Sequence, residues 1–101
     1  MTDNKKYPKY LNLRGFLCFQ ILHKLSKKAL CGDVLAMEIG GKKFGKLTPG
    51  TIYPALKVLR DRRLVQFKTE GRKKIYHLTK RGLGEYKISK RLFKRIFKEL
   101  F

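Results

Sequence analysis

The chain has 101 residues, 43% of them hydrophobic, which is enough for one folded domain with a modest core and too much for a disordered chain. Twenty-six lysines and arginines stand against seven acidic residues, so the formal net charge is +19 at pH 7. This excess favours a polyanionic partner, nucleic acid above all. Heat adaptation is the alternative explanation of a lysine-rich surface, but it usually brings a matching number of glutamates.

The sequence contains no recognisable catalytic or metal-binding pattern. The two cysteines, Cys18 and Cys31, have neither zinc nor redox spacing, and we expect both to be reduced apolar residues in the cytoplasm, with a disulfide between them as the alternative. The sequence has no apolar run of about 18 residues and no signal peptide. We therefore expect a cytoplasmic protein that is not an enzyme and needs no metal or cofactor.

The N-terminal part predicts a basic arm over residues 1–10 and then a first helix from a cap at Asn12 to about Lys27. One stripe of this helix is expected to lie in the domain core; it consists of Leu17, Ile21, Leu22 and Leu25. The opposite side carries Phe16 and Phe19, which need a second surface to cover them. His23 lies beside them and is expected at the surface or in an interface.

A short apolar stub, residues 29–31, precedes a second helix that begins at Gly32-Asp33 and is stopped or weakened at Gly40-Gly41. We expect such a stub to pair with a strand from elsewhere in the chain. The buried side of this helix is predicted to comprise Val34, Leu35, Met37 and Ile39. Three lysines in the following connection, Lys42, Lys43 and Lys46, are either phosphate contacts or parts of a solvated loop.

The third predicted helix begins at Thr48, whose hydroxyl can cap it, and Pro49, whose backbone angle suits the first helical position. Its apolar stripe comprises Ile52, Ala55, Leu56 and Leu59. A second stripe about 100° away is polar and basic and comprises Tyr53, Lys57 and Arg60. A short helix with one buried face and one basic face is typical of the element that enters a DNA groove.

Two β-rich runs, residues 64–69 and 73–78, surround Glu70-Gly71-Arg72 and predict a hairpin. Alternation places Val65 and Phe67 on one face of the first strand, and Tyr76 and Leu78 on one face of the second. The tip carries Arg72, Lys73 and Lys74. Beside a groove-binding helix, such a tip commonly reaches the DNA backbone or the minor groove, although the lysines are also explicable as solubilising charge.

The last predicted helix is capped by Thr79 and carries a broad apolar band beside a basic face. So small a domain cannot cover this whole band, so we expect it to pair with a second copy of the chain. A basic amphipathic helix on an anionic membrane is the weaker alternative. The expected dimer interface comprises Phe16, Phe19, Leu83, Tyr86, Leu92, Phe93, Ile96, Phe97 and Leu100.

The run from Thr48 to Leu59, TPGTIYPALKVL, resembles the S-P-G-T-L/I-Y-P-A-L-x-x-L pattern of the PadR family of transcriptional regulators. Leu13-Arg14-Gly15 and Leu78-Thr79-Lys80-Arg81-Gly82 are also similar to the start and the post-wing segment of PadR chains. Asp33 departs from the pattern, because PadR proteins usually have tyrosine after this glycine. The resemblance implies a mainly α fold with a small β-hairpin (α+β): a winged helix-turn-helix over residues 11–78 and a dimerisation helix over residues 79–101.

The resemblance also implies a sequence-specific regulator of transcription that binds double-stranded DNA as a homodimer, usually as a repressor. A nucleoid or architectural protein with little sequence preference is the alternative, because the +19 charge suits it. An RNA-binding role fits the charge but not the resemblance. Many PadR proteins respond to small molecules, but no effector is assigned here. The expected DNA contacts are Lys42, Lys43, Lys46, Thr48, Gly50, Thr51, Tyr53, Lys57, Arg60, Arg72, Lys73 and Lys74.

Overall fold

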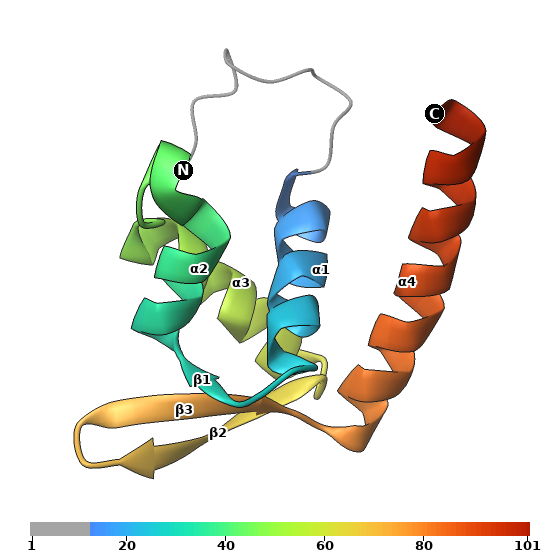
Figure 1. Cartoon of the computed structure of the whole chain (residues 1–101). Coiled ribbons are helices and arrows are strands. Elements are labelled where there is room, and N and C mark those ends of the chain that lie inside the picture. Colours follow the sequence, from blue (N-terminus) through green and yellow to red (C-terminus); the bar gives the residue numbers. More distant parts are fainter. Residues whose placement is uncertain (1–12) are drawn as a thin grey trace.

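The computed structural model describes residues 13–101, except for the side chains of residues 13, 14 and 42–44; the predicted N-terminal arm and the Asn12 cap lie outside the described residues. The elements follow the order α1 (Leu13–Leu25), β1 (Leu30–Cys31), α2 (Gly32–Phe44), α3 (Pro49–Asp61), β2 (Val65–Glu70), β3 (Lys73–Leu78) and α4 (Lys80–Leu100). Helices α1 to α3 pack together above the sheet, the β2–β3 hairpin projects to one side, and α4 stands beside α1 (Figure 1). The predicted α+β class is confirmed.

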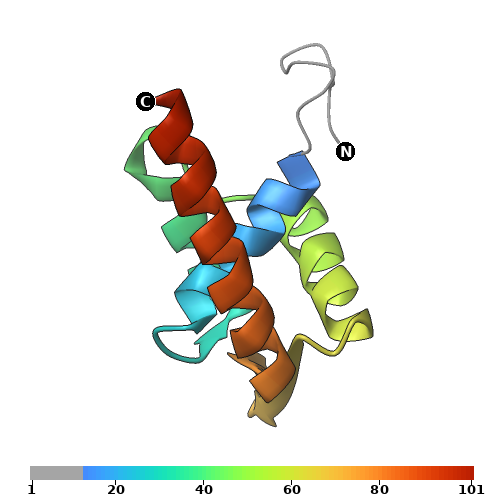
Figure 2. The same ribbon diagram turned by 90° about the vertical axis from the view of Figure 1, so that its right-hand side faces the viewer.

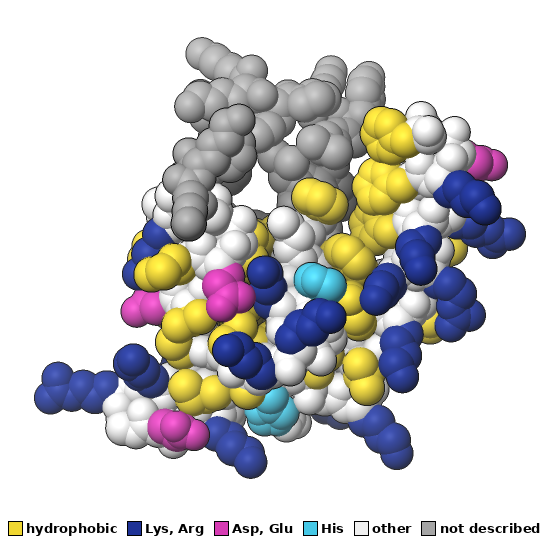
Figure 3. All heavy atoms as spheres, viewed as in Figure 1, with side chains coloured by type: hydrophobic (Ala, Val, Ile, Leu, Met, Phe, Trp, Pro, Cys, Tyr) yellow, Lys and Arg dark blue, Asp and Glu magenta, His cyan; other side chains and the backbone are white. Residues whose placement is uncertain are grey.

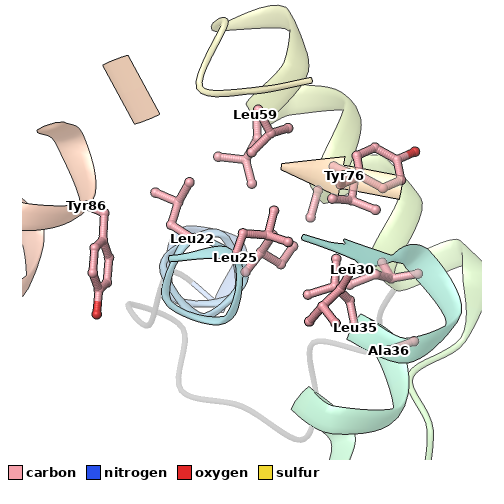
Figure 4. Packing of buried hydrophobic residues seen from close by; sticks show 13 residues of the cluster. Leu22, Leu25, Leu30, Leu35, Ala36, Leu59, Tyr76 and Tyr86 are labelled. Atoms are coloured by element: carbon pink, nitrogen blue, oxygen red, sulfur yellow. The ribbon is translucent and has the colours of Figure 1, made fainter. Parts of the chain in front are cut away.

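One apolar cluster joins the three packed helices to the sheet. Leu22 and Leu25 of α1, Leu35 of α2, Leu59 of α3 and Tyr76 of β3 are buried side chains that meet in it (Figure 4). The apolar stripes predicted for α1 and α3 both lie in this cluster. The largest fully buried side chains are Ile21, Leu35, Ile52, Leu56 and Val65.

Helix α2 buries a different face from the predicted one. Leu35 and Ala36 are buried, whereas Val34 and Met37 are exposed. At 100° per residue, positions 35, 36 and 39 fall within one arc of about 100°, and positions 34 and 37 lie outside it on either side. The prediction of Val34 and Met37 as core residues was therefore wrong.

The two glycines at the end of α2 weaken the helix, as predicted. Gly41 has a left-handed φ of 71°, which interrupts the regular helix before its last turn. A Cβ atom on Gly40 would lie 1.8 Å from the carbonyl oxygen of Gly45, so only glycine allows the chain to fold back here. The amide of Leu47 then donates to the carbonyl of Ala36 at 3.0 Å and closes the turn between α2 and α3.

The three strands form an antiparallel sheet with the order β1–β3–β2. Val65 lies opposite Leu78, and Phe67 lies opposite Tyr76, so the predicted strand faces are confirmed. Leu30 of the predicted stub also pairs with Tyr76, from the other side of β3. Gly71, with a φ of 62°, allows the tight turn at the hairpin tip.

Helix α4 is joined to the end of α3 at a single compact junction. The hydroxyl of Thr79 accepts from the amide of Gly82 at 2.9 Å, as the predicted cap requires, and donates to the carbonyl of Arg63 at 2.7 Å. The amide of Thr79 donates to the carbonyl of Leu64 at 3.1 Å. From this junction α4 runs across α1 (Figure 2).

Candidate nucleic-acid interface

The predicted groove-binding face of α3 is exposed to solvent. Ile52, Ala55, Leu56 and Leu59 anchor the opposite face in the core. The six candidate residues at the start and on the outer face of α3 are all exposed; they are Thr48, Gly50, Thr51, Tyr53, Lys57 and Arg60. Burial of the apolar stripe therefore fixes α3 with its basic face outward.

The helix start differs from the prediction in one detail. Thr48 occupies the N-cap position and Pro49 follows it at the first turn, but the Thr48 hydroxyl does not cap the backbone. It pairs with the hydroxyl of Thr51 at 3.1 Å, while the carbonyl of Thr48 accepts from the amides of Thr51 and Ile52. The predicted hydroxyl cap was wrong, because the two threonine hydroxyls satisfy each other.

Tyr53 is held against the start of α2. A Cβ atom on Gly32 would lie 2.6–2.8 Å from the ring and hydroxyl of Tyr53, so the absence of a side chain at residue 32 makes room for this ring. Partial burial and then the nearby Asp33 carboxylate raise the pKa of Tyr53, so it keeps its phenolic proton at neutral pH. A neutral hydroxyl can donate a hydrogen bond to a phosphate or a base.

The tip of the β2–β3 hairpin, which is the predicted wing, lies beside Tyr53. Arg72, Lys73 and Lys74 line one hollow of about 320 Å³ together with Cys31, Gly32, Asp33 and Tyr53. The structure therefore brings the outer face of α3, the start of α2 and the basic hairpin tip to one side of the domain. Figure 3 shows the basic side chains that project from the hairpin.

Two candidate lysines form ion pairs with carboxylates in this region. Lys57 contacts Asp61 at 2.9 Å, and Lys46 contacts Asp33 at 3.4 Å. All four side chains are largely exposed, and such pairs contribute little to stability, so both lysines can exchange their partner for a phosphate. The side chains of Lys42 and Lys43 lie outside the described part of the chain.

Phe67 was placed by the sequence on a strand face but not in the site. In the structure, the Arg60 guanidinium and the Lys74 ammonium both lie over its ring, at 5.1 and 4.8 Å from the ring centroid. The strand register indicates that Lys74 is close to Phe67, because the Thr69–Lys74 pair follows the Phe67–Tyr76 pair on the same face of the hairpin. Sequence alone did not show that Arg60 reaches this face.

Several residues predicted for the dimer interface contact one another within the chain. The ring of Phe93 in α4 lies 6.2 Å from that of Phe16 and 4.5 Å from that of Phe19 in α1, measured between centroids. Tyr86 is only 5% exposed; its ring stacks on Phe19, and its hydroxyl shares a hydrogen bond with Nδ1 of His23. The second surface that covers the α1 aromatic residues is therefore, at least in part, the chain's own α4.

The groove between α1 and α4 is aromatic inside and basic at its rim. Yellow side chains line the edge of α4 that faces α1, and lysines and arginines cover its outer side (Figure 3). Burial and the charges of Lys27, Lys90 and Lys24 lower the pKa of His23 and so favour its neutral imidazole. Further along α4, Leu92, Ile96 and Leu100 remain half exposed or more.

Within residues 13–101, no group of three or more histidine, cysteine, aspartate or glutamate side chains is placed to hold a metal ion. In the same part of the chain, no helix has the length and apolar character needed to cross a bilayer.

A helix-turn-helix with an exposed basic second helix and a basic hairpin beside it defines a winged-helix DNA-binding protein. The sequence profile of the transcriptional regulator PadR-like family matches residues 21–88, which is most of the chain. The protein therefore belongs to the PadR-like family, and it is a DNA-binding regulator of transcription.

Solved structures support this assignment. A PadR family transcription regulator from Clostridium difficile is 26% identical, with a TM-score of 0.75 over 85% of this chain and 95% of that one. A PadR-like transcription factor from Bacteroides fragilis (23% identity, TM-score 0.68, 88% and 93% coverage) shares the fold. So does RosR from H. salinarum (21% identity, TM-score 0.71, 94% and 81% coverage). No curated protein sequence matches the chain significantly.

Proposed function

We propose that the protein binds specific double-stranded DNA sites as a homodimer and acts as a transcriptional repressor in the cytoplasm. Helix α3 enters the major groove, and the wing holds the flanking backbone. The observation that carries this proposal is the shared location of Tyr53, Lys57 and Arg60 on α3 with the basic wing tip at residues 72–74. Groove contacts read the base sequence, while backbone contacts fix the position of the protein.

The three segments of the chain have separate roles in this proposal. Residues 11–78 form the DNA-binding unit, residues 79–101 pair with a second copy, and the basic arm over residues 1–10 carries further positive charge. Lys42, Lys43 and Lys46 contact phosphates from the turn that leads into α3. The exposed start of α3 at Thr48 and Gly50 offers backbone amides to a phosphate.

The apolar surface of α4 supports pairing with a second copy. Leu92, Ile96 and Leu100 are 50–66% exposed, and Phe97 is 44% exposed. A monomeric protein rarely leaves so many large apolar side chains along one helix in water. A homodimer made through α4, with Leu83, Phe16 and Phe19 at its margin, would cover them and set two α3 helices on one DNA duplex.

The charge of +19 per chain favours a second candidate, an architectural protein that coats DNA with little sequence preference. Phosphate contacts alone account for such binding, and its affinity falls steeply as salt rises. The two candidates differ in whether the exposed face of α3 reads bases.

A comparison of two duplexes separates the candidates. DNA from upstream of the protein's own gene and a scrambled duplex of the same length are titrated at several salt concentrations. A regulator of its own gene is expected to prefer the upstream DNA by about a hundredfold or more near physiological salt. If both duplexes bind alike and lose affinity together, that site is not an operator and the architectural candidate moves ahead, subject to a broader selection of sequences.

Two lysine variants assign the roles of helix and wing. Lys57→Ala should weaken operator binding by about tenfold and reduce the preference over scrambled DNA, because a base contact is lost. Lys73→Ala should weaken binding to both duplexes and reduce the slope of log affinity against log salt by about one. Lys87→Ala, on the outer side of α4, is the control for the loss of one charge. An equal loss on both duplexes from Lys57→Ala would contradict its role in base reading.

A further inference from the structure

The ring of Phe67 in β2 lies between two elements of the proposed DNA-binding surface. The guanidinium carbon of Arg60, near the end of α3, is 5.1 Å from the ring centroid. The ammonium nitrogen of Lys74, at the wing, is 4.8 Å from the same centroid. Both distances fall within the range of about 6 Å in which a cation is attracted to an aromatic face.

No carboxylate in the described part of the chain lies within ion-pair distance of either cation. Arg60 and Lys74 are both exposed. Two like charges that approach the same ring also repel each other. The contact that the two cations share is the ring of Phe67.

The ring itself is anchored in the domain. Phe67 is half-buried and lies opposite Tyr76, whose ring is 5.5 Å away between centroids and only 2% exposed. Val65, two residues earlier on the same strand face, is fully buried. One side of Phe67 thus belongs to the core, while the cations over its ring reach the solvent.

We propose that Phe67 is a positioning residue for DNA binding, which holds Arg60 of α3 and Lys74 of the wing as one pre-arranged cationic surface. This inference rests on the proposed function. Side chains that are already ordered lose less conformational freedom when they bind, so the held cations bind phosphate more tightly than mobile ones. The ring also couples the wing to α3, so the two elements approach the duplex in a fixed relation.

The test is a double-mutant cycle on operator affinity. Phe67→Leu retains an apolar side chain but removes the aromatic face, and it should lower affinity by about three- to tenfold at about 0.1 M salt. Arg60→Gln should reduce operator affinity by a clearly smaller factor in the Phe67→Leu background than in the wild-type background, because the Arg60 cation is no longer held in the Phe67→Leu protein. Phe67→Tyr retains the aromatic face and should restore wild-type affinity.

A purely structural role of Phe67 predicts a different pattern. Val65→Ala is the matched control, because it removes core packing on the same strand face and leaves the ring in place; it should lower the melting temperature without changing the affinity of the folded protein. Additive losses in the cycle, or a Phe67→Tyr variant that binds as weakly as Phe67→Leu, would overturn the proposal.

A second measurement needs no DNA. In the nuclear magnetic resonance spectrum of the free protein, protons near the Arg60 guanidinium and the Lys74 ammonium should show upfield ring-current shifts that disappear in Phe67→Leu. Their absence in the wild type would also overturn the proposal. If the wild type fails to bind duplex DNA at all, the proposed function falls and this inference falls with it. Normal wild-type binding with additive losses removes the inference alone.

Discussion

Substitution by alanine at two glycines near the start of α4 should have opposite effects on the stability of the protein. A Cβ atom on Gly82 would lie 1.9 Å from the carbonyl oxygen of Leu64 and 2.9 Å from its carbonyl carbon. A Cβ atom on Gly84, two residues further along, would have no heavy atom within 4 Å outside its own helix and chain neighbours. We predict that Gly82→Ala destabilises the protein and Gly84→Ala stabilises it.

The magnitudes follow from the junction between α3 and α4. Real Cβ contacts are essentially never shorter than 3.0 Å, so Gly82→Ala must move α4 away from Leu64 by about 1.1 Å. This shift strains the Thr79 bonds to Arg63 and Leu64, each worth about 1 kcal/mol, and adds overpacking of about 1–3 kcal/mol. Loss of both bonds and the overpacking together cost about 3–5 kcal/mol; after a gain of about 1 kcal/mol from helix propensity, the net loss of stability is about 2–4 kcal/mol. Gly84→Ala retains only the gain, about 0.5–1 kcal/mol.

Denaturant unfolding followed by circular dichroism measures both effects at one fixed protein concentration, since binding of a second copy would add to the apparent stability. In a domain of this size, these changes in stability correspond to a fall in melting temperature of about 10–30 °C for Gly82→Ala and a rise of a few degrees for Gly84→Ala. A Gly82→Ala variant as stable as Gly84→Ala would refute the close approach of α4 to Leu64.

Two further predictions concern α1 and α4. Because the pKa of His23 is lowered in the folded protein, the unfolded chain, with a pKa near 6.5, takes up a proton first as the pH falls. The free energy of unfolding should therefore fall as the pH drops from 7 towards 5. His23→Gln retains a partner for the Tyr86 hydroxyl and should make the melting temperature less dependent on pH over that range. An unchanged slope in His23→Gln would contradict this. Ile96→Glu places a charge on the exposed apolar side of α4 and should shift the sedimentation coefficient to that of a monomer, whereas Lys87→Glu on the basic side should not. A dimeric Ile96→Glu would exclude this face from the interface.

The elements with strong local signals could be predicted from the sequence. The polar and apolar stripes of α3 are separated by helical periodicity, and the apolar stripe could face only the core. Strand alternation predicted the inward faces of the two hairpin strands, the glycine predicted the turn between them, and the short apolar stub paired with β3 as expected. Thr79 capped α4 because its hydroxyl stands three residues before the amide that needs it.

The remaining features depend on contacts between distant residues. Periodicity shows that Phe16 and Phe19 need a covering surface, but it does not show whether that surface is the chain's own α4 or a second copy. The buried face of α2 was misassigned because every side of its first turns offers an apolar residue. The position of Arg60 over Phe67 depends on the angle between α3 and the sheet, which no local pattern contains.

The carbonyl of Leu64 has a mechanical consequence for the whole molecule. It accepts from the amide of Thr79 and lies against Gly82, so this junction, together with the aromatic contacts of α4 to α1, sets the direction of α4 relative to α3. A helix of 21 residues is about 30 Å long. A rotation of about 5° at this joint therefore moves the far end of α4 by nearly 3 Å, close to the rise of one DNA base pair. A small change of angle at this junction therefore changes the distance between the DNA-binding domain at one end of α4 and any partner bound at the other end.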